Sequence, residues 1–137
     1  MKNLSLKLGA LLAFVFVWGL STAYAGNSIK ITQPTNGATV SSPVKVCMEV
    51  HGVEVQPAKM GVHDGKGHHH ILVDVDVPSD LGKPIGKDAH HIHMGDGSTC
   101  KEVKLDAGKH TLRTLFAKGN HVPYSPALTD AVSVTVK

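Results

Sequence analysis

Two histidine clusters carry the clearest chemistry in this sequence. They are Gly67-His68-His69-His70 and His90-His91-Ile92-His93, and each contains histidines two positions apart. A β-strand turns positions i and i+2 to the same face, so two imidazoles at this spacing can converge on one ion. Neutral imidazole suits copper, zinc or nickel, whereas calcium and magnesium prefer oxygen ligands. With ten histidines in 137 residues, the pattern predicts a transition-metal site.

The apolar alternation predicts which face of a strand these histidines occupy. Ile71 and Val73 share one parity in the first segment, so the histidines at positions 68 and 70 face away from the core. Ile92 and Met94 set the apolar parity in the second segment, so the histidines on either side of Ile92 point outward together. If the two segments pair as neighbours, four imidazoles meet on one sheet face. The predicted main ligands are His68, His70, His91 and His93.

The first 25 residues have the pattern of a secretory signal. A basic start with Lys2 and Lys7 precedes an apolar run at 8–20, and Ala23-Tyr24-Ala25 fits the small-x-small cleavage site, so we expect cleavage between Ala25 and Gly26. A retained anchor is the alternative, but the run is shorter than the roughly 20 residues of a membrane span. The prediction is a signal at 1–25 and a soluble domain at 26–137, exported to a bacterial periplasm and not held at a membrane.

Size and charge restrict what the exported part can be. About 110 residues suffice for one domain with one core. Removing two lysines from 14 basic residues leaves 12 against 11 acidic ones, a formal charge of +1. This balance gives no electrostatic attraction to nucleic acid, so we expect no nucleic-acid partner.

The periodicity after the signal is that of short strands. Apolar and β-branched residues alternate in short segments, and turn residues such as Gly, Pro, Asn and Asp separate them. We expect an all-β fold, a single antiparallel β-sandwich of immunoglobulin-like type, with a small β-barrel as the alternative. The predicted strands are 28–32, 44–50, 69–75, 99–105, 111–116 and 131–136.

Cys47 and Cys100 are the two cysteines. Both have the outward parity of their segments, and two cysteines in an exported protein usually join. We expect a cross-strand disulfide, which would stabilise the fold by about 3 to 4 kcal/mol. The alternative is a pair of copper ligands or a redox pair.

Several motifs follow one another in order along the chain after the signal: Gln33-Pro34 with Gly37-Ala38, the run 67–74, His91 to Gly95, Gly108 to Leu112 and Asn120 to Pro123. Together they resemble a family of small bacterial exported domains named domain of unknown function 4399. The resemblance covers nearly all of the chain after the signal. The family has no settled biochemical role, so the resemblance implies little about activity. It makes further histidines second-choice ligands, because they stand in the shared motifs; His69 and His110 have core parity and can instead be hydrogen-bonded strand-end residues. The second-choice ligands are His69, His110 and His121.

A narrower likeness suggests an enzyme. His91-Ile92-His93 with Gly95-Asp96-Gly97 and Cys100 looks like the copper-binding strand and disulfide loop of copper/zinc superoxide dismutase. The likeness stops there, because the sole arginine, Arg113, stands within a predicted strand and only one histidine follows it. Dismutase activity is therefore a minor alternative.

Two functional classes remain. The first is a periplasmic protein that binds, delivers or buffers a histidine-ligated copper or zinc ion without turnover, so that we expect no enzyme activity. Copper is slightly favoured because Met48, Met60 and Met94 could supply soft thioether sulfur. The second is a non-catalytic interaction or scaffold module of the cell envelope, in which the histidines hydrogen-bond loops together or bind a periplasmic protein partner.

Overall fold

The structure of the protein is a computed structural model that describes residues 26–137. The predicted signal, up to Ala25, lies outside the described residues. Nine strands and one short 3-10 turn make up the described part of the chain. Their bounds are β1 Ser28–Gln33, β2 Ala38–Val40, β3 Val44–His51, β4 Glu54–Val55, η1 Ala58–Met60, β5 Lys66–Val73, β6 His91–His93, β7 Cys100–Val103, β8 Gly108–Ala117 and β9 Thr129–Val136.

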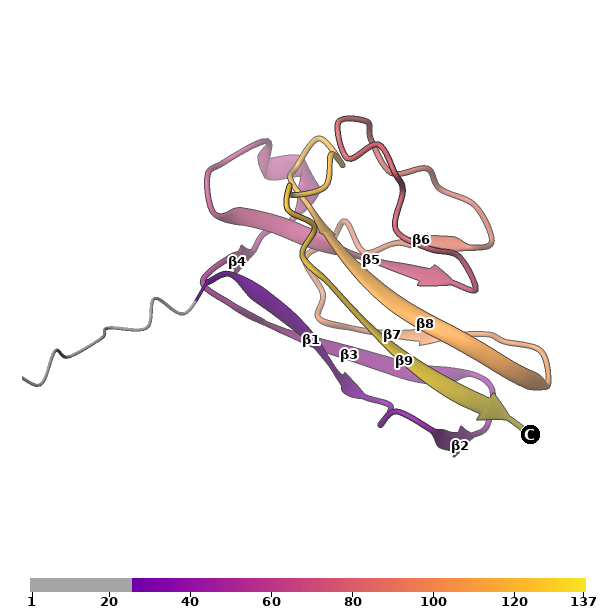
Figure 1. Cartoon of the computed structure of the whole chain (residues 1–137). Helices are drawn as coiled ribbons and strands as arrows, with labels where there is room; N and C mark the ends of the chain where they lie inside the picture. The colour runs from indigo at the N-terminus through magenta and orange to yellow at the C-terminus, as the bar shows by residue number, and fades with distance from the viewer. Residues whose placement is uncertain (1–25) are drawn as a thin grey trace, which may run out of the picture.

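The strands form two sheets that pack face to face, as Figure 1 shows. The smaller sheet has the order β1-β3-β7, and the larger has the order β2-β9-β8-β5-β4, with β6 also paired to β5. The expected all-β sandwich is confirmed. Its pairs are antiparallel except for two short parallel ones, β2 with β9 and β4 with β5, which the sequence did not predict.

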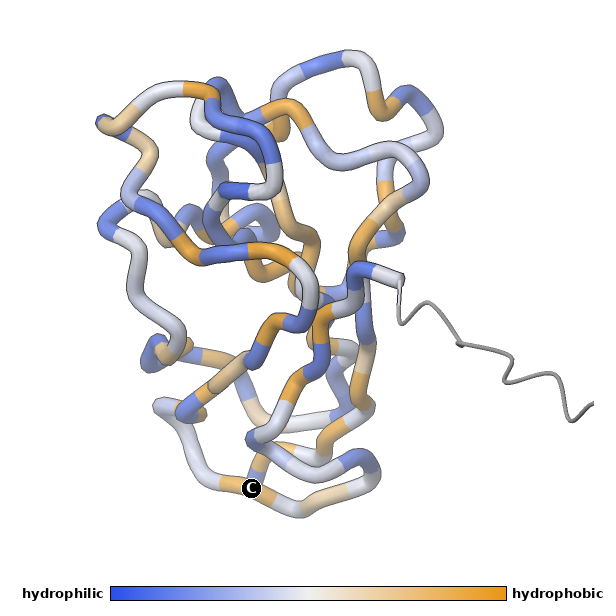
Figure 2. The backbone as a smooth tube through the Cα atoms, turned by 90° about the vertical axis from the view of Figure 1, so that its left-hand side faces the viewer, coloured by the Kyte–Doolittle hydropathy of each residue, from blue (hydrophilic) through white to orange (hydrophobic). Residues whose placement is uncertain are grey.

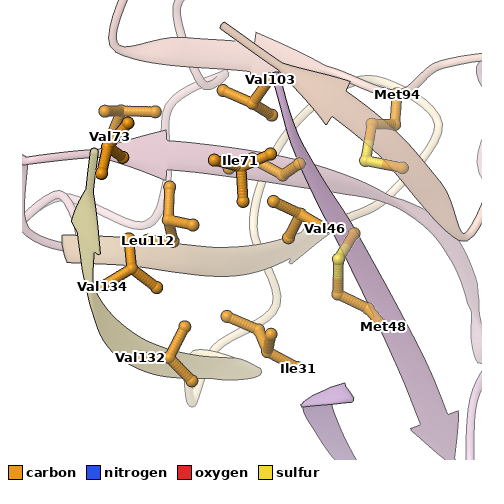
Figure 3. Close-up of a cluster of buried hydrophobic side chains, with 12 residues drawn as sticks. Ile31, Val46, Met48, Ile71, Val73, Met94, Val103, Leu112, Val132 and Val134 are labelled. Carbon is orange, nitrogen blue, oxygen red and sulfur yellow. The ribbon is translucent and has the colours of Figure 1, made fainter. Parts of the chain in front are cut away.

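The main core lies between the two sheets. Alternate residues of β1 and β3 face alternate residues of β5, β8 and β9, as Figure 3 shows. The same alternation of apolar and polar residues is visible along the strands in Figure 2. The core includes Ile31, Val46, Met48, Ile71, Val73, Met94, Val103, Leu112, Val132 and Val134.

Strand β5 is buried on both faces, and this corrects the expectation that His68 and His70 point away from any core. A second apolar cluster, formed by Leu72, Ile85, Leu115 and Ala117, covers the outer face of the larger sheet. Ile85 belongs to the long β5–β6 connection, so this connection shields the face that alternation alone marks as outward. His68 and His70 are 0% and 1% exposed.

The predicted disulfide between Cys47 and Cys100 is confirmed. The two residues are register partners on β3 and β7, in the smaller sheet. Neither strand contributes a histidine to the cluster described below. The cysteines therefore act as a structural link between two neighbouring strands.

Strand β5 ends at Val73, earlier than the predicted 75. Asp74 has a φ of 58°, in the left-handed region, so the extended backbone cannot continue through it. The Asp74 carboxylate accepts a hydrogen bond from the Thr111 backbone N–H at 2.8 Å, which holds this turn against β8.

Within residues 26–137, no helix has the length and apolar character needed to cross a membrane.

Candidate metal centre

Four histidines from three separate segments converge at one end of the larger sheet. Each offers one ring nitrogen, and these four nitrogens all lie within 4.8 Å of one another. Two of the rings are fully buried and two are half-buried. The cluster consists of His68, His70, His93 and His121, and we call it the histidine cluster.

Three ring nitrogens surround one central nitrogen, His68 Nε2. His70 Nε2 and His121 Nδ1 each lie 3.1 Å from it, and His93 Nε2 lies 3.2 Å from it. A neutral imidazole nitrogen has either one N–H or one lone pair, so hydrogen bonding can satisfy only one of these contacts well. Nitrogens held about 2.0 to 2.1 Å from a tetrahedral zinc ion lie about 3.3 to 3.4 Å apart. The observed separations are close to that spacing, so the histidine cluster can hold a metal ion.

Strand register brings three of the four histidines together. His68 and His70 are two apart on β5 and share one face, as their spacing predicts. β6 pairs antiparallel with β5 so that His93 stands directly opposite His70. Cross-strand neighbours have Cβ atoms about 4.5 to 5.5 Å apart, within reach of two imidazoles that lean toward a common point.

A tight turn after β8 supplies the fourth histidine. His121 has a φ of 66°, which is rare for a residue other than glycine. Its N–H donates to the Lys118 carbonyl at 2.8 Å, and its carbonyl accepts from the Ile85 N–H at 2.9 Å. This bent backbone turns the His121 ring onto His68. Sequence reasoning reached His121 only as a second choice, because no strand periodicity covers it.

His91 lies outside the histidine cluster, although it was predicted as a main ligand. His91 shares a face of β6 with His93, but its register partner on β5 is Leu72, two residues beyond His70. Its Nδ1 lies 2.8 Å from the Asp88 carboxylate. The ring is therefore engaged by the β5–β6 connection and not by the other imidazoles.

His69 and His110, the other second choices, also lie elsewhere. His69 faces the main core, where its ring packs edge-on against Phe116 at 5.1 Å between centroids. His110 Nδ1 lies 2.7 Å from the Asp74 carboxylate, and its Nε2 lies 2.8 Å from the Asp106 carbonyl. These are the hydrogen-bonded or packed strand positions that their core parity allowed.

The methionines do not support the preference for copper. Met48 and Met94 pack in the main core between the sheets. Met60 is 55% exposed on the short turn before β5. The donors that the structure gathers are imidazole nitrogens, which suit copper and zinc alike.

Burial keeps the two fully buried imidazoles of the cluster, those of His68 and His70, neutral at ordinary pH. It lowers the pKa of His68 to about 4, and the neighbouring His93 and His121 rings add to the effect. Burial likewise lowers the pKa of His70 to about 3, with His68 and His93 as further causes. The pKa of His93 is also lowered, by burial first and then by His121 and Lys87. A neutral imidazole has the free lone pair that a metal needs.

The Nδ1 atoms of the two fully buried rings have no hydrogen-bond partner among the described residues. Nδ1 of His68 and Nδ1 of His70 are buried and form no hydrogen bond with any described residue. A buried polar atom without a partner costs free energy, in the range of about 1 to 3 kcal/mol. Among the described residues, the polar contacts of these two rings are therefore made by their convergent Nε2 atoms.

One side of the histidine cluster opens onto a small cavity of about 140 Å³. Three histidines of the cluster line it together with part of the β5–β6 connection, whereas His68 does not. The lining residues are His70, Ile85, Gly86, Lys87, His93 and His121.

Comparison with known proteins identifies a family but no activity. The sequence model of the family described as Domain of unknown function (DUF4399) matches residues 46–137. A search of curated proteins finds no match. Among solved structures, the endo-β-1,4-mannanase from Thermotoga petrophila is similar, with a TM-score of 0.48 at 12% identity. That match covers 86% of this chain and 21% of the mannanase chain, a likeness too distant to transfer an activity.

Proposed function

The chain belongs to the DUF4399 family of domains of unknown function, and from its histidine cluster we propose that it binds one copper or zinc ion. The proposed ligands are Nε2 of His68, His70 and His93 and Nδ1 of His121. The observation that carries the proposal is the approach of three ring nitrogens to His68 Nε2 at 3.1 to 3.2 Å, a contact set that hydrogen bonds cannot satisfy together.

We further propose that the protein acts outside the cytoplasm, in the periplasm of a bacterium. The signal-like first 25 residues support this location. The Cys47–Cys100 disulfide also supports it, because such bonds persist in oxidising compartments. In that setting a four-imidazole site suits binding, delivery or buffering of the metal, and we propose no turnover.

Metal titration of the exported form tests this function. Protein starting at Gly26, without a polyhistidine tag, is stripped with a chelator and titrated with Cu(II) and Zn(II) against competing chelators. We expect one equivalent of at least one metal to bind with a sub-micromolar dissociation constant, because four preformed imidazole ligands need little rearrangement. If neither metal binds, the proposal is wrong, and an interaction module becomes the better interpretation of the histidines.

A matched pair of variants on β6 locates the site. His93→Ala removes a proposed ligand, whereas His91→Ala removes the neighbouring imidazole that contacts Asp88. We expect His93→Ala to weaken metal binding by 10-fold or more, on the order of effects known for metal-site residues, and His91→Ala to change it little. Circular dichroism checks that both variants keep the sheet. Equal losses of affinity would contradict the ligand assignment.

A further inference from the structure

The histidine cluster is closed on one side and open on the other. His68 is 0% exposed and lies away from the cavity, while His93 and His121 are half-buried at its wall. An ion held among the four nitrogens would thus have protein behind it and the cavity of about 140 Å³ in front of it. The opening gives a route from solvent to one face of the bound ion.

We propose that the metal ion in this cluster accepts a small inorganic anion as an additional ligand, and that this anion enters through the cavity lined by Ile85, Gly86 and Lys87. The inference rests on the proposed metal function and names the class of ligand that the same site takes. Copper and zinc can both add a ligand to four protein donors, since zinc sites expand to five-coordinate and copper favours tetragonal arrangements.

The size of the cavity limits the ligand to a few atoms. Pockets for drug-sized molecules measure about 300 to 1,000 Å³, and one water molecule occupies about 30 Å³ in the liquid. A volume of about 140 Å³ equals that of roughly four to five waters, which is enough for a small anion such as azide. It is well below the volume of a pocket for a drug-sized molecule.

The charge of the site selects an anion. All four proposed protein ligands are neutral imidazoles, so a divalent ion keeps its full double positive charge. None of the six residues lining the cavity is acidic, and Lys87 adds a cation at the wall. A negative ligand would reduce the net positive charge in this small volume, whereas a cation would be repelled by it.

Lys87 is well placed to attract an anion because the segment that carries it is hydrogen-bonded to the turn of His121. The Ile85 N–H donates to the His121 carbonyl at 2.9 Å, which joins the β5–β6 connection to the turn that presents a ligand. Lys87 follows two residues later, is itself exposed and contributes to the cavity wall. Lys83, on the same connection, does not line the cavity and is paired with Asp80 at 3.3 Å.

Azide binding to the copper-loaded protein tests the proposal. The protein with one equivalent of Cu(II) is desalted, its copper content is measured, and sodium azide is added while charge-transfer absorption and electron paramagnetic resonance are followed. We expect a saturable new absorption band with copper retained.

Two lysine variants test the entry path. Lys87→Gln should weaken azide binding about two- to fivefold, the scale of a single exposed charge, while copper affinity stays the same. Lys83→Gln should match the wild type. If the two substitutions weaken azide binding equally, Lys87 does not contribute specifically to anion binding at the cavity. If copper is retained but azide produces no response, the proposed anion ligand is wrong and the proposed metal binding stands. If the protein binds no metal, both this inference and the proposed function are wrong.

Discussion

The backbone of Gly95 lies directly against the imidazole ring of His93. A Cβ atom at position 95 would overlap the His93 ring atoms Cε1 and Nε2. The Gly95 carbonyl also accepts a hydrogen bond from the Ala58 N–H at 2.9 Å, so this backbone cannot move away freely. The absence of a side chain at position 95 is therefore what allows the His93 ring to reach His68.

Gly95→Ala should weaken metal binding by 10-fold or more, because the new methyl group displaces a proposed ligand ring. The measurement is a competition titration with Cu(II) or Zn(II), with circular dichroism to confirm the fold. Gly26→Ala is the matched control, since a Cβ atom there meets nothing within 4 Å and Gly26 lies outside the cavity wall. If both variants bind metal like the wild type, the close approach of Gly95 to His93 does not control the site.

His121 should show opposite effects on stability and binding. Its left-handed backbone costs a residue with a side chain about 1 to 2 kcal/mol relative to glycine. His121→Gly should thus raise the free energy of unfolding of the metal-free protein by about 1 kcal/mol and lower metal affinity by 10-fold or more.

His121→Ala separates the two effects of that substitution. It also removes the imidazole but keeps a Cβ atom at the strained position, so it should lose affinity without gaining stability. Urea unfolding of the metal-free proteins gives the comparison. A glycine variant no more stable than the alanine variant would show that the turn stores no strain.

The metal-free protein should lose stability as the pH falls from about 6.5 to about 4. Burial lowers the pKa of His69 to about 4, as it lowers those of His68 and His70 to about 4 and about 3. An unfolded histidine titrates near 6.5, so below that pH the unfolded state takes up protons that the folded state does not, and unfolding is favoured. Urea unfolding at pH 7.5, 5.5 and 4.5 measures this, and equal stabilities at the three pH values would contradict it.

His110 should act in the opposite direction. Hydrogen bonds to Asp74 and Asp106 raise the pKa of its imidazole, so its stabilising contribution is present below about pH 6.5 and is lost as the pH rises through the raised pKa. With His110→Asn, the loss of stability relative to the wild type should grow as the pH falls from about 8 to about 6.5 and stay constant below that. Parallel pH profiles for the variant and the wild type would show that the contact with Asp74 adds no charge-dependent stability.

The disulfide should contribute to stability but not to metal binding. It closes a loop with a sequence separation of 53, for which chain entropy gives a stabilisation of about 4 kcal/mol. The double variant Cys47→Ser with Cys100→Ser should lose about 3 to 4 kcal/mol of unfolding free energy and keep its metal affinity wherever it is folded. If the folded variant binds metal more weakly than the wild type, the prediction is wrong, and the geometry of the histidine cluster depends on the smaller sheet.

Strand periodicity predicted the positions of His68, His70 and His93 well. A period of two fixes which residues share a face of a strand, and antiparallel pairing then places His93 opposite His70. The same rule placed His91 on the correct face, but it carries no information on how far along β5 that residue falls. The assignment of these residues as metal ligands stays a prediction.

Two features were beyond the reach of the sequence. The position of His121 depends on one left-handed residue in an irregular turn, which periodicity does not describe. The burial of His68 depends on the β5–β6 connection folding back over the sheet, with Ile85 packed against Leu72. Alternation separates the two faces of a strand, but it does not tell whether a loop will cover the second face.

The double burial of β5 ties the chemistry of this protein to its architecture. Residues 69, 71 and 73 face the other sheet, and residues 68, 70 and 72 face the histidine cluster and its apolar surround. A single-residue insertion or deletion between 68 and 73 would exchange imidazoles for aliphatic groups on both sides at once. We therefore expect a length change to be tolerated in the connecting segments, such as 74–90, and not within β5.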